Sequence, residues 1–259
     1  KKEIKSKSYV RFLDIFHGVG FNQPKIEGHV DRAGTIVCDG INYEDSISNA
    51  EKSIWEVMEE CALSPDEEIS LKSYTEDLGM IYISTPFSRA AAEFLYDIGV
   101  PAFKIGSGEC NHLPLIKHIA KFSKPVIMST GMQTIEGLKP SIEILQESNI
   151  DYALLECTNL YPSPPEIVSL QGIQELRVNF PDAVIGFSDH SIGPSMALAA
   201  VGLGACIIER HFTDTRFRKG PDIVCSMDPS ELRFLIERSK EISIALNNPK
   251  KRKKVMLAS

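Results

Sequence analysis

The fold is decided by residues 184–222, which read VIGFSDHSIGPSMALAAVGLGACIIERHFTDTRFRKGPD. Two short β-branched runs, 184–187 and 206–208, each end in a polar cluster that holds a histidine, His190 after the first and His211 after the second. The small residues between the runs have the length of one helix. Strand, helix and strand in this order predict a right-handed parallel crossover, with the two strands as neighbours and both histidines at their carboxyl ends.

The two histidines are candidate metal ligands. Parallel α/β proteins keep their chemistry at the carboxyl ends of the strands. Two imidazoles brought together there, with Asp189, Glu209 and Asp222 close by, form a donor set suited to a divalent metal. The alternative is that each histidine caps a strand or packs, but two histidines in register on adjacent strands favour the metal.

Length and composition bound the class of protein. A chain of 259 residues suits one large domain, and a (β/α)8 barrel takes about 250. The net charge of −7 argues against a nucleic-acid partner. No apolar run reaches the ~18 residues of a membrane span, and the amino terminus lacks the apolar centre of a signal peptide. Six scattered cysteines without a CxxC pair predict reduced thiols and a cytoplasmic location.

Apolar runs alternate with amphipathic segments along most of the chain. Strands are predicted at 80–85, 102–105, 125–130, 152–158, 184–189 and 206–212. Helices are predicted between them at 88–98, 112–122, 133–148, 165–178 and 194–203, and capping boxes open two more, near residue 65 and at 229–246.

This alternation predicts an α/β fold with a parallel sheet covered by helices. Six clear units, with two strand-like early runs in SYVRFLDIF and GTIVCDG, favour a (β/α)8 TIM barrel whose first two strands are atypical; a doubly wound open sheet is the alternative. We expect an irregular segment at 1–48 that contributes the early strands, the barrel units at 49–247, and a basic tail at 248–259.

Polar groups follow every predicted strand. In chain order they are Thr85; Lys104, Ser107 and Glu109; Ser129; Asn159 and Tyr161; Ser188 and His190; and His211. Hydroxyl and amide groups around one lysine suit a phosphate or a phosphate-plus-carboxylate ligand. Glu109 is a candidate acid or base, or else a helix N-terminal glutamate, and Tyr161 either contacts the ligand or packs in its turn. These residues predict a metal-dependent barrel enzyme that handles a phosphorylated anion.

Six ordered strings carry a family resemblance. They are STPFS (84–88), KIGSGECN (104–111), STGM (129–132), CTNLYP (157–162), GFSDHSIG (186–193), and ERHFTD (209–214) with KGPD (219–222). In order and spacing, from about residue 49 to 247, the chain resembles the N-acetylneuraminate (sialic acid) synthase family. The resemblance implies a (β/α)8 barrel that condenses phosphoenolpyruvate with N-acetylmannosamine and releases phosphate.

The resemblance also implies roles for individual residues. His190 and His211 would bind Mn²⁺, with Mg²⁺ or Co²⁺ as alternatives, and Glu109 would be the carboxylate at the reacting centre. Phosphoenolpyruvate would be held by Thr85, Lys104, Ser107, Ser129, Asn159 and Ser188. The sugar would be contacted by Asn49, Tyr161 and Asp222.

Two departures keep alternatives open. The family's first-strand and second-strand motifs are not recognisable in residues 1–48, and the chain stops where the family's antifreeze-like domain would begin. The swapped dimer of the family is therefore not carried over, although a homodimer stays an option. The alternatives are a related nonulosonic acid synthase, such as one for legionaminic acid, a 3-deoxy-sugar-acid synthase, and a catalytically silent barrel that only binds metal or phosphoenolpyruvate.

Overall fold

A six-stranded parallel sheet forms the centre of the computed structural model, which describes residues 11–13 by their backbone, 62–217 and 222–247. The strand order across the sheet is β1-β6-β5-β4-β3-β2. The strands are β1 (Arg11–Leu13), β2 (Phe103–Ile105), β3 (Val126–Ser129), β4 (Tyr152–Cys157), β5 (Val184–Asp189) and β6 (Ile207–Arg210).

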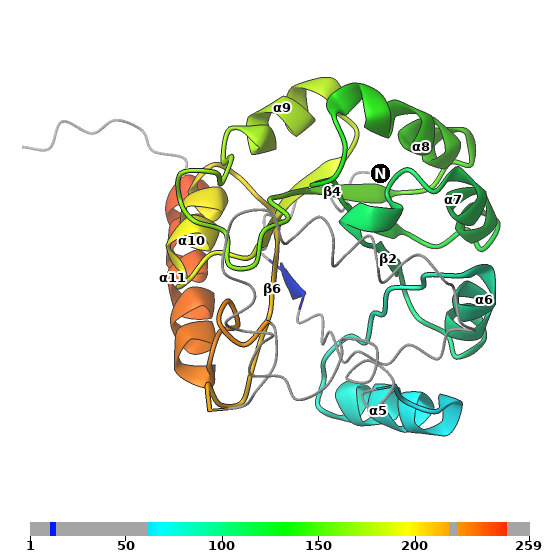
Figure 1. Ribbon diagram of the computed structural model, residues 1–259, viewed down its shortest axis with the longest axis horizontal. Coiled ribbons are helices and arrows are strands. Elements are labelled where there is room, and N and C mark those ends of the chain that lie inside the picture. The colour runs from blue at the N-terminus through cyan, green and yellow to red at the C-terminus, as the bar shows by residue number, and fades with distance from the viewer. Residues whose placement is uncertain (1–10, 14–61, 218–221, 248–259) are drawn as a thin grey trace, which may run out of the picture.

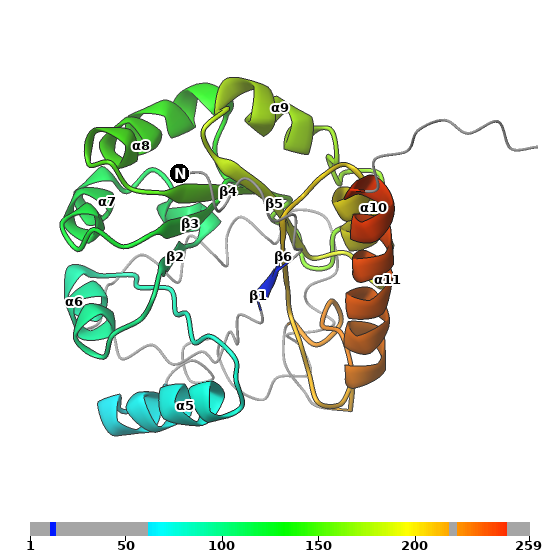
Figure 2. The same ribbon diagram turned by 180° about the vertical axis from the view of Figure 1, so that it is seen from behind.

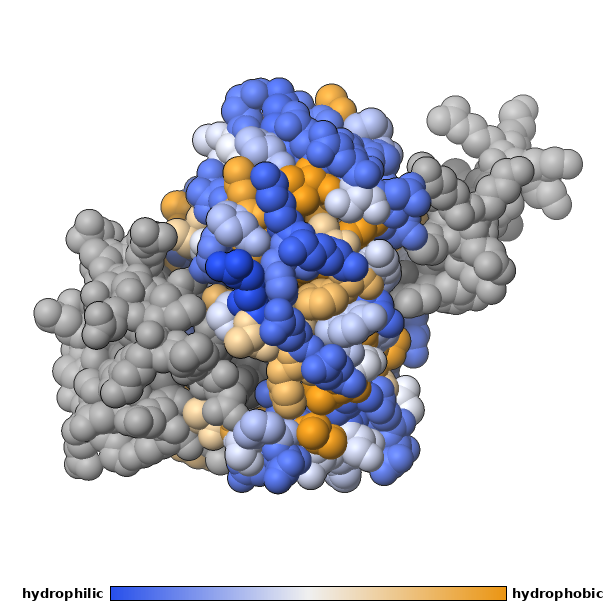
Figure 3. Space-filling view, turned by 90° about the vertical axis from the view of Figure 1, so that its right-hand side faces the viewer, coloured by the Kyte–Doolittle hydropathy of each residue, from blue (hydrophilic) through white to orange (hydrophobic). Residues whose placement is uncertain are grey.

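Helices cover the outer face of this sheet and form an arc around it (Figure 1). They are α5 (Pro65–Asp77), α6 (Arg89–Asp97), α7 (Leu113–Ala120), α8 (Ile135–Glu147), α9 (Gly172–Asn179), α10 (Ser195–Gly202) and α11 (Pro229–Asn247), with a short 3-10 helix η1 (Ser107–Glu109). From the side of α6, α7 and α8 the surface is mostly hydrophilic, with apolar residues interspersed (Figure 3). Among the described residues, no helix is long and apolar enough to cross a bilayer.

The first strand of the chain lies beside the last. β1 pairs in parallel with β6, from Arg11 opposite Ile207 to Leu13 opposite Glu209, and Figure 2 shows the curved sheet on which this pair lies. A doubly wound open sheet instead keeps its first strand in the interior of the strand order. The pairing of first with last is the closure that a barrel requires, so the predicted (β/α)8 class is confirmed over the open sheet.

Strand side chains alternate between two layers, as the two-residue period of a strand requires. Phe103, Met128, Leu154, Phe187 and Ile208 point outward into the main core between sheet and helices. The positions between them point inward, where a smaller apolar cluster of Ile127, Ala153 and Leu155 packs with Ile83, Val184 and Ile207. The inward positions nearer the carboxyl ends are polar, so the inner layer changes from apolar to polar along the strands.

Both predicted capping boxes are confirmed. The Ser64 hydroxyl accepts the N–H of Glu67, whose carboxylate accepts the N–H of Ser64 at 2.7 Å. At the start of α11, the Asp228 carboxylate accepts the N–H groups of Ser230 and Glu231 at 2.8 and 2.9 Å. These contacts satisfy donors that have no partner inside the helix.

Three predicted elements differ from the structure. Residues 80–85 form no strand: one 3.4 Å bond, from the Lys104 N–H to the Ser84 carbonyl, is too little for a ladder. The helix predicted at 165–178 begins only at Gly172, because Pro164 and Pro165 lack N–H donors and the chain first makes turns. The last strand spans Ile207–Arg210 rather than 206–212.

The other predicted strands and helices agree within a few residues at each end. SYVRFLDIF contains β1, as expected of a strand-like run. The GTIVCDG run, the boundary at residue 48 and the tail at 248–259 lie outside the described residues.

Candidate active site at the carboxyl end of the sheet

The candidate site is built from inward-facing positions at the carboxyl ends of β2 to β6. All of them are buried and are the last or the last but one residue of a strand: Lys104, Ser129, Cys157, Ser188 and Glu209. Ser129, Cys157, Ser188 and Glu209 are each separated by an even number of residues from a member of the inner apolar cluster on the same strand, so they share its face. Lys104 is the register partner of Ile127, which belongs to that cluster. Strand register alone therefore brings five polar side chains to one end of the inner layer.

Lys104 is the cation of this layer. Its side chain is 1% exposed, and its ammonium donates to the Ser129 hydroxyl at 2.8 Å and to the Ile105 carbonyl at 3.0 Å. The Glu209 carboxylate lies 3.3 Å from both the Lys104 ammonium and the Ser129 hydroxyl. A buried charge must be paired or hydrogen-bonded, and this network does both for the lysine.

Cys157 lies at the centre of the hydroxyl groups. Its thiol donates to the Asn159 side-chain oxygen at 3.0 Å, and Ser107 and Ser188 also hydrogen-bond to it. Burial raises the pKa of Cys157 to about 11, although these hydroxyls and Lys104 act in the opposite direction. The thiol therefore stays protonated at neutral pH and acts as a packing and hydrogen-bonding group rather than a nucleophile.

Two further hydroxyl groups border this set. The Ser107 hydroxyl accepts the N–H of Gly131 at 3.1 Å, which joins η1 to the loop after β3. The Thr85 hydroxyl oxygen is buried and has no hydrogen-bond partner within the described structure. A buried polar group without a partner is costly, so this hydroxyl is available to a ligand.

Glu109 ends η1 and is buried. Its carboxylate contacts Nδ1 of His112, three residues later and half-exposed, in a short hydrogen bond. Glu109 is the last residue of a 3-10 turn, and it contacts a titratable ring. Both features go beyond the alternative, in which Glu109 only complements the dipole of an α-helix. Such a pair is able to hold or pass a proton.

The two histidines meet as the sequence predicts. Asp189 of β5 is opposite Arg210 of β6, so the next residues, His190 and His211, are neighbours, with ring centroids 5.3 Å apart. The Tyr161 ring contacts both of them, with its centroid 4.0 Å from that of His190 in a tilted arrangement and 5.6 Å from that of His211 in an edge-to-face arrangement. Burial raises the pKa of Tyr161 well above its ordinary value, so its hydroxyl remains a donor.

Both imidazoles are suited to bind a cation. Nδ1 of His190 lies 3.0 Å from the Thr158 carbonyl oxygen, which accepts only from a protonated nitrogen, so in the neutral ring the lone pair is on Nε2. Burial lowers the pKa of His211 to about 4, against the opposing effect of Glu209, and keeps that ring neutral at pH 7. Metal ligation requires neutral imidazole, so the donor chemistry fits.

The acidic residues near the histidines divide into separate roles. Asp222 lies 3.8 Å from Nδ1 of His211 and remains beside the pair. Asp189 instead forms an ion pair with Arg210, and Glu209 binds Lys104, so each of these carboxylates is paired with a cation of the protein itself. Within the described residues no three or more His, Cys, Asp or Glu side chains lie close enough together to hold a metal ion by themselves. An ion at the histidine pair would take its other ligands from substrate, water or the rest of the chain.

Sequence reasoning missed two residues of the site. Glu209 and Cys157 belong to the inner polar layer but were given no role in holding the anion. The signal for Glu209 was present, because Glu209 and His211 are two residues apart on one strand and therefore share a face. Asn49, which was assigned to the sugar, lies outside the described residues.

Known proteins match this chain over most of its length. Residues 32–251 match the model of the NeuB family. Human N-acetylneuraminate-9-phosphate synthase is 37% identical over 188 residues, 73% of this chain and 52% of the human protein. Legionella pneumophila N,N'-diacetyllegionaminic acid synthase is 33% identical over 215 residues, 81% of this chain and 60% of that protein. The chain thus spans about half the length of the human relative.

A solved structure also matches. The crystal structure of N-acetylneuraminic acid (sialic acid) synthetase from Leptospira borgpetersenii has a TM-score of 0.74 and 27% sequence identity, over 81% of this chain and 74% of that one.

Proposed function

Because the chain belongs to the NeuB family, we propose that it forms the catalytic barrel of a synthase that condenses phosphoenolpyruvate with N-acetylmannosamine to give N-acetylneuraminate and phosphate. The observation that carries the proposal is the convergence of two features on one end of the sheet. One is the buried Lys104 ammonium among hydroxyl groups, and the other is the His190–His211 pair. Together they offer a place for a phosphorylated anion beside a place for a metal.

The anion is assigned to the Lys104 side of the site. Lys104 supplies the positive charge, and Ser129 and Thr85 supply hydroxyl donors. The remaining groups of this set, Ser107, Asn159 and Ser188, gather around Cys157. A bound phosphate would take over the contact that the Lys104 ammonium makes with Glu209 in this structure, since both anions compete for one cation.

The sugar is assigned to the histidine side. Tyr161 contacts both imidazoles, and Asp222 lies beside His211, so both residues border the place where an aldehyde oxygen would approach a cation. Mn²⁺, or alternatively Mg²⁺ or Co²⁺, would be held by His190 and His211 and, when bound, supplies polarisation of that aldehyde. Asn49 remains a predicted sugar contact.

The proposed reaction forms one carbon–carbon bond and one carbon–oxygen bond to water, and it breaks the carbon–oxygen bond to phosphate. The enol carbon of phosphoenolpyruvate attacks the aldehyde carbon of the open-chain sugar, water adds to the adjacent carbon of the former enol, and phosphate leaves with its bridging oxygen. Glu109, whose carboxylate contacts His112, would stabilise the cationic intermediate and move the proton of the attacking water. Hydroxyl donors around Lys104 retain the departing phosphate.

The related legionaminic acid synthase remains a specific alternative. The chain is 37% identical to a human enzyme named for N-acetylneuraminate 9-phosphate and 33% identical to a bacterial enzyme named for diacetyllegionaminate. Identities this similar do not select the sugar, and the proposed sugar contacts are few. N-acetylmannosamine, its 6-phosphate and the sugar precursor of diacetyllegionaminate are therefore the three acceptors to compare.

The test measures phosphate release from phosphoenolpyruvate by the full chain with Mn²⁺, with and without each sugar, and again after chelation. Release that needs both metal and a sugar is the expected result. Phosphoenolpyruvate binding by calorimetry without any release would overturn the proposed activity in favour of a silent binding barrel.

A lysine variant tests the anion site. Lys104→Met combined with Glu209→Gln removes the ammonium without leaving a buried carboxylate unpaired. We expect phosphoenolpyruvate affinity to fall by about tenfold or more, because a charge-assisted hydrogen bond contributes ~1.5–3 kcal/mol, while Mn²⁺ affinity stays unchanged. Lys139→Met, which removes an exposed lysine paired with Glu136 on α8, is the matched control. If the double variant lost affinity for phosphoenolpyruvate and for Mn²⁺ to the same extent, the result would contradict the role of Lys104.

A further inference from the structure

Asp189 and Arg210 form a buried ion pair immediately before the two histidines. The Asp189 carboxylate lies 3.2 Å from the Arg210 guanidinium, and their side chains are 0% and 1% exposed. The two residues are also direct register partners across β5 and β6. Two kinds of contact therefore hold the last paired position of the two strands: the pairing of the strands in the sheet, and the ion pair between the side chains.

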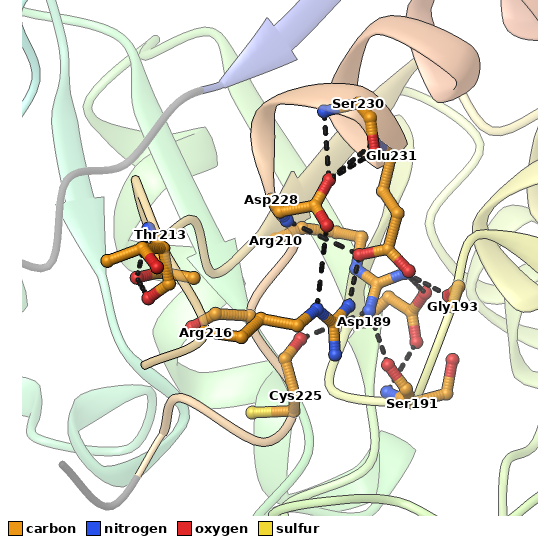
Figure 4. Close-up of polar contacts among 12 residues, drawn as sticks. Asp189, Ser191, Gly193, Arg210, Thr213, Arg216, Cys225, Asp228, Ser230 and Glu231 are labelled. Carbon is orange, nitrogen blue, oxygen red and sulfur yellow. Dashed lines mark hydrogen bonds and ion pairs between the residues drawn. The ribbon is translucent and has the colours of Figure 1, made fainter. Parts of the chain in front are cut away.

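The guanidinium of Arg210 also holds three backbone carbonyls (Figure 4). It donates to the carbonyls of Ser191 and Gly193, in the loop that follows His190, and to the carbonyl of Cys225 at 3.2 Å. The Asp189 carboxylate accepts the N–H of Ser191 at 2.8 Å, in the same loop. We call these two side chains, with their backbone partners, the Asp189–Arg210 clamp.

The clamp lies on the other face of the sheet from the site. Asp189 and Arg210 take the outward positions of their strands, and the next residues, His190 and His211, take the inward ones. An imidazole's direction depends on the backbone dihedrals of its own and adjacent residues, which the clamp fixes on both strands. Because the clamp lies on the opposite face of the sheet from the anion site and the histidine pair, it affects the two imidazoles only through the backbone.

The segment after residue 221 is held by the same side chain. Cys225 lies three residues after Asp222, and the Met227 N–H donates to the carbonyl of His211 at 2.8 Å. Arg210 thus links the strand end that carries His190, the one that carries His211, and the segment that carries Asp222. Contacts to three carbonyls from one planar fork require arginine, because lysine offers a single point of donation.

Stability alone gives a weak reason for this pair. Replacing a buried ion pair by apolar side chains of similar volume is often neutral or stabilising for the fold. In some proteins a buried polar or ionic group is retained because it specifies one arrangement of the structure. Here every partner of the guanidinium belongs to a segment that carries a histidine or Asp222.

We infer that Asp189 and Arg210 are positioning residues that set the spacing and direction of His190 and His211. This inference rests on the proposed function only for the metal; the arrangement of the two rings is a property of the protein without ligand. Loss of the clamp leaves the fold in place and loosens the histidine pair.

The experiment compares the wild type with Asp189→Leu/Arg210→Met, in which both charges are removed together. Arg210→Lys is the milder variant, which keeps the ion pair but loses the fork. The control is Arg216→Met, an arginine six residues later in the chain whose ion pairs with Asp228 and Glu231 do not involve a histidine-bearing strand. Folding of each variant is checked by circular dichroism and thermal unfolding.

Two readouts separate the clamp from the metal. The first is the rate of acylation of His190 and His211 by diethyl pyrocarbonate in the metal-free protein, measured by mass spectrometry. The half-exposed His112 serves as internal reference. The second is Mn²⁺ affinity by calorimetry.

We expect the double variant to fold, its two histidines to react at least fivefold faster, and its Mn²⁺ affinity to fall about tenfold or more, as is typical when supporting partners of metal ligands are removed. Arg216→Met should match the wild type in both. A folded double variant, or a folded Arg210→Lys variant, with unchanged labelling would overturn the inference. Wild-type protein that binds no Mn²⁺ would refute the metal assignment, while the labelling still decides the role of the clamp.

Discussion

Gly131 occupies a position in the site where no side chain fits. A Cβ atom there would lie 2.6 Å from the carbonyl oxygen of Cys157 and 2.8 Å from the side-chain oxygen of Asn159. The closest of these contacts is with backbone, which cannot rotate away. The loop after β3 therefore approaches the end of β4 closely because Gly131 has no side chain.

Two glycine substitutions test this requirement. Gly131→Ala must displace the segment 157–159, and we expect it to lower the free energy of unfolding by ~1–3 kcal/mol, as overpacking does. Gly202→Ala is the matched control, because no atom lies within 4 Å of its added Cβ and the residue belongs to α10. There we expect a gain of ~0.5–1 kcal/mol from the helix preference of alanine. Urea unfolding measures both, and equal effects at the two glycines would refute the packing argument.

At the scale of elements, β4 and α9 enclose a carboxyl group. Glu156 points outward from β4, and a Cβ atom at Gly172, the first residue of α9, would lie 2.4 Å from its carboxyl carbon. Burial, together with the nearby charge of Glu175, raises the pKa of Glu156 to about 7. The strand and the helix thus meet over a carboxyl group that prefers to be neutral.

This contact predicts a pH-dependent stability. The folded-state pKa of Glu156 lies above its ordinary value of 4.5, so the folded protein keeps a proton that the unfolded chain releases. Stability should fall as the pH rises from about 4.5 to 7 and not change further from this cause above that. Glu156→Gln should remove this fall and raise the free energy of unfolding at pH 8 by on the order of 3 kcal/mol.

Urea unfolding at pH 5 and pH 8 measures the effect as the difference between variant and wild type, because other groups titrate in the same range. Glu147→Gln, on the exposed surface of α8, is the control and should keep the wild-type pH profile. If the stability of Glu156→Gln changed with pH in the same way as that of the wild type, the buried Glu156 carboxyl group would not be the cause of the pH dependence.

At the scale of the whole molecule, sheet register determines the site. Six parallel strands in the order β1-β6-β5-β4-β3-β2 bring Lys104 of β2 within 3.3 Å of Glu209 of β6, although three strands lie between β2 and β6 in the sheet. Such a contact requires a curved sheet, because in a flat one these two strands would be about 19 Å apart. The curvature that makes the barrel is thus the same feature that assembles the anion site.

Metal binding should therefore be visible in the stability of the whole fold. At an Mn²⁺ concentration of 100 times its Kd, we expect the free energy of unfolding to rise by ~2.7 kcal/mol, because the unfolded chain lacks the paired histidines. His190→Ala and His211→Ala should each abolish this gain. His118→Ala, a variant of a helical histidine that pairs with Glu93, should keep it. Thermal and urea unfolding with and without Mn²⁺ provide the test, and a gain that survives in either site variant would exclude the pair as the metal site.

Much of this arrangement could be predicted from the sequence. The crossover from β5 to β6, the adjacency of His190 and His211, the helices from α6 to α11 and both capping boxes follow from local patterns whose periods and spacings are set by backbone geometry. The family, too, was accessible, because strand-end strings such as KIGSGECN and ERHFTD lie in contiguous sequence.

Only the tertiary structure decided which polar groups meet. Asp189 and Glu209 lie one and two residues before a histidine and Asp222 lies eleven residues after His211, yet it is Asp222 that lies beside His211, while Asp189 faces the helices with Arg210 and Glu209 binds Lys104. The run 80–85 has the composition of a strand but forms no ladder. Local pattern specifies which face of a strand a side chain takes, whereas its partner comes from another strand dozens of residues away. That choice depends on the register and curvature of the sheet, which arise from the packing of the whole chain.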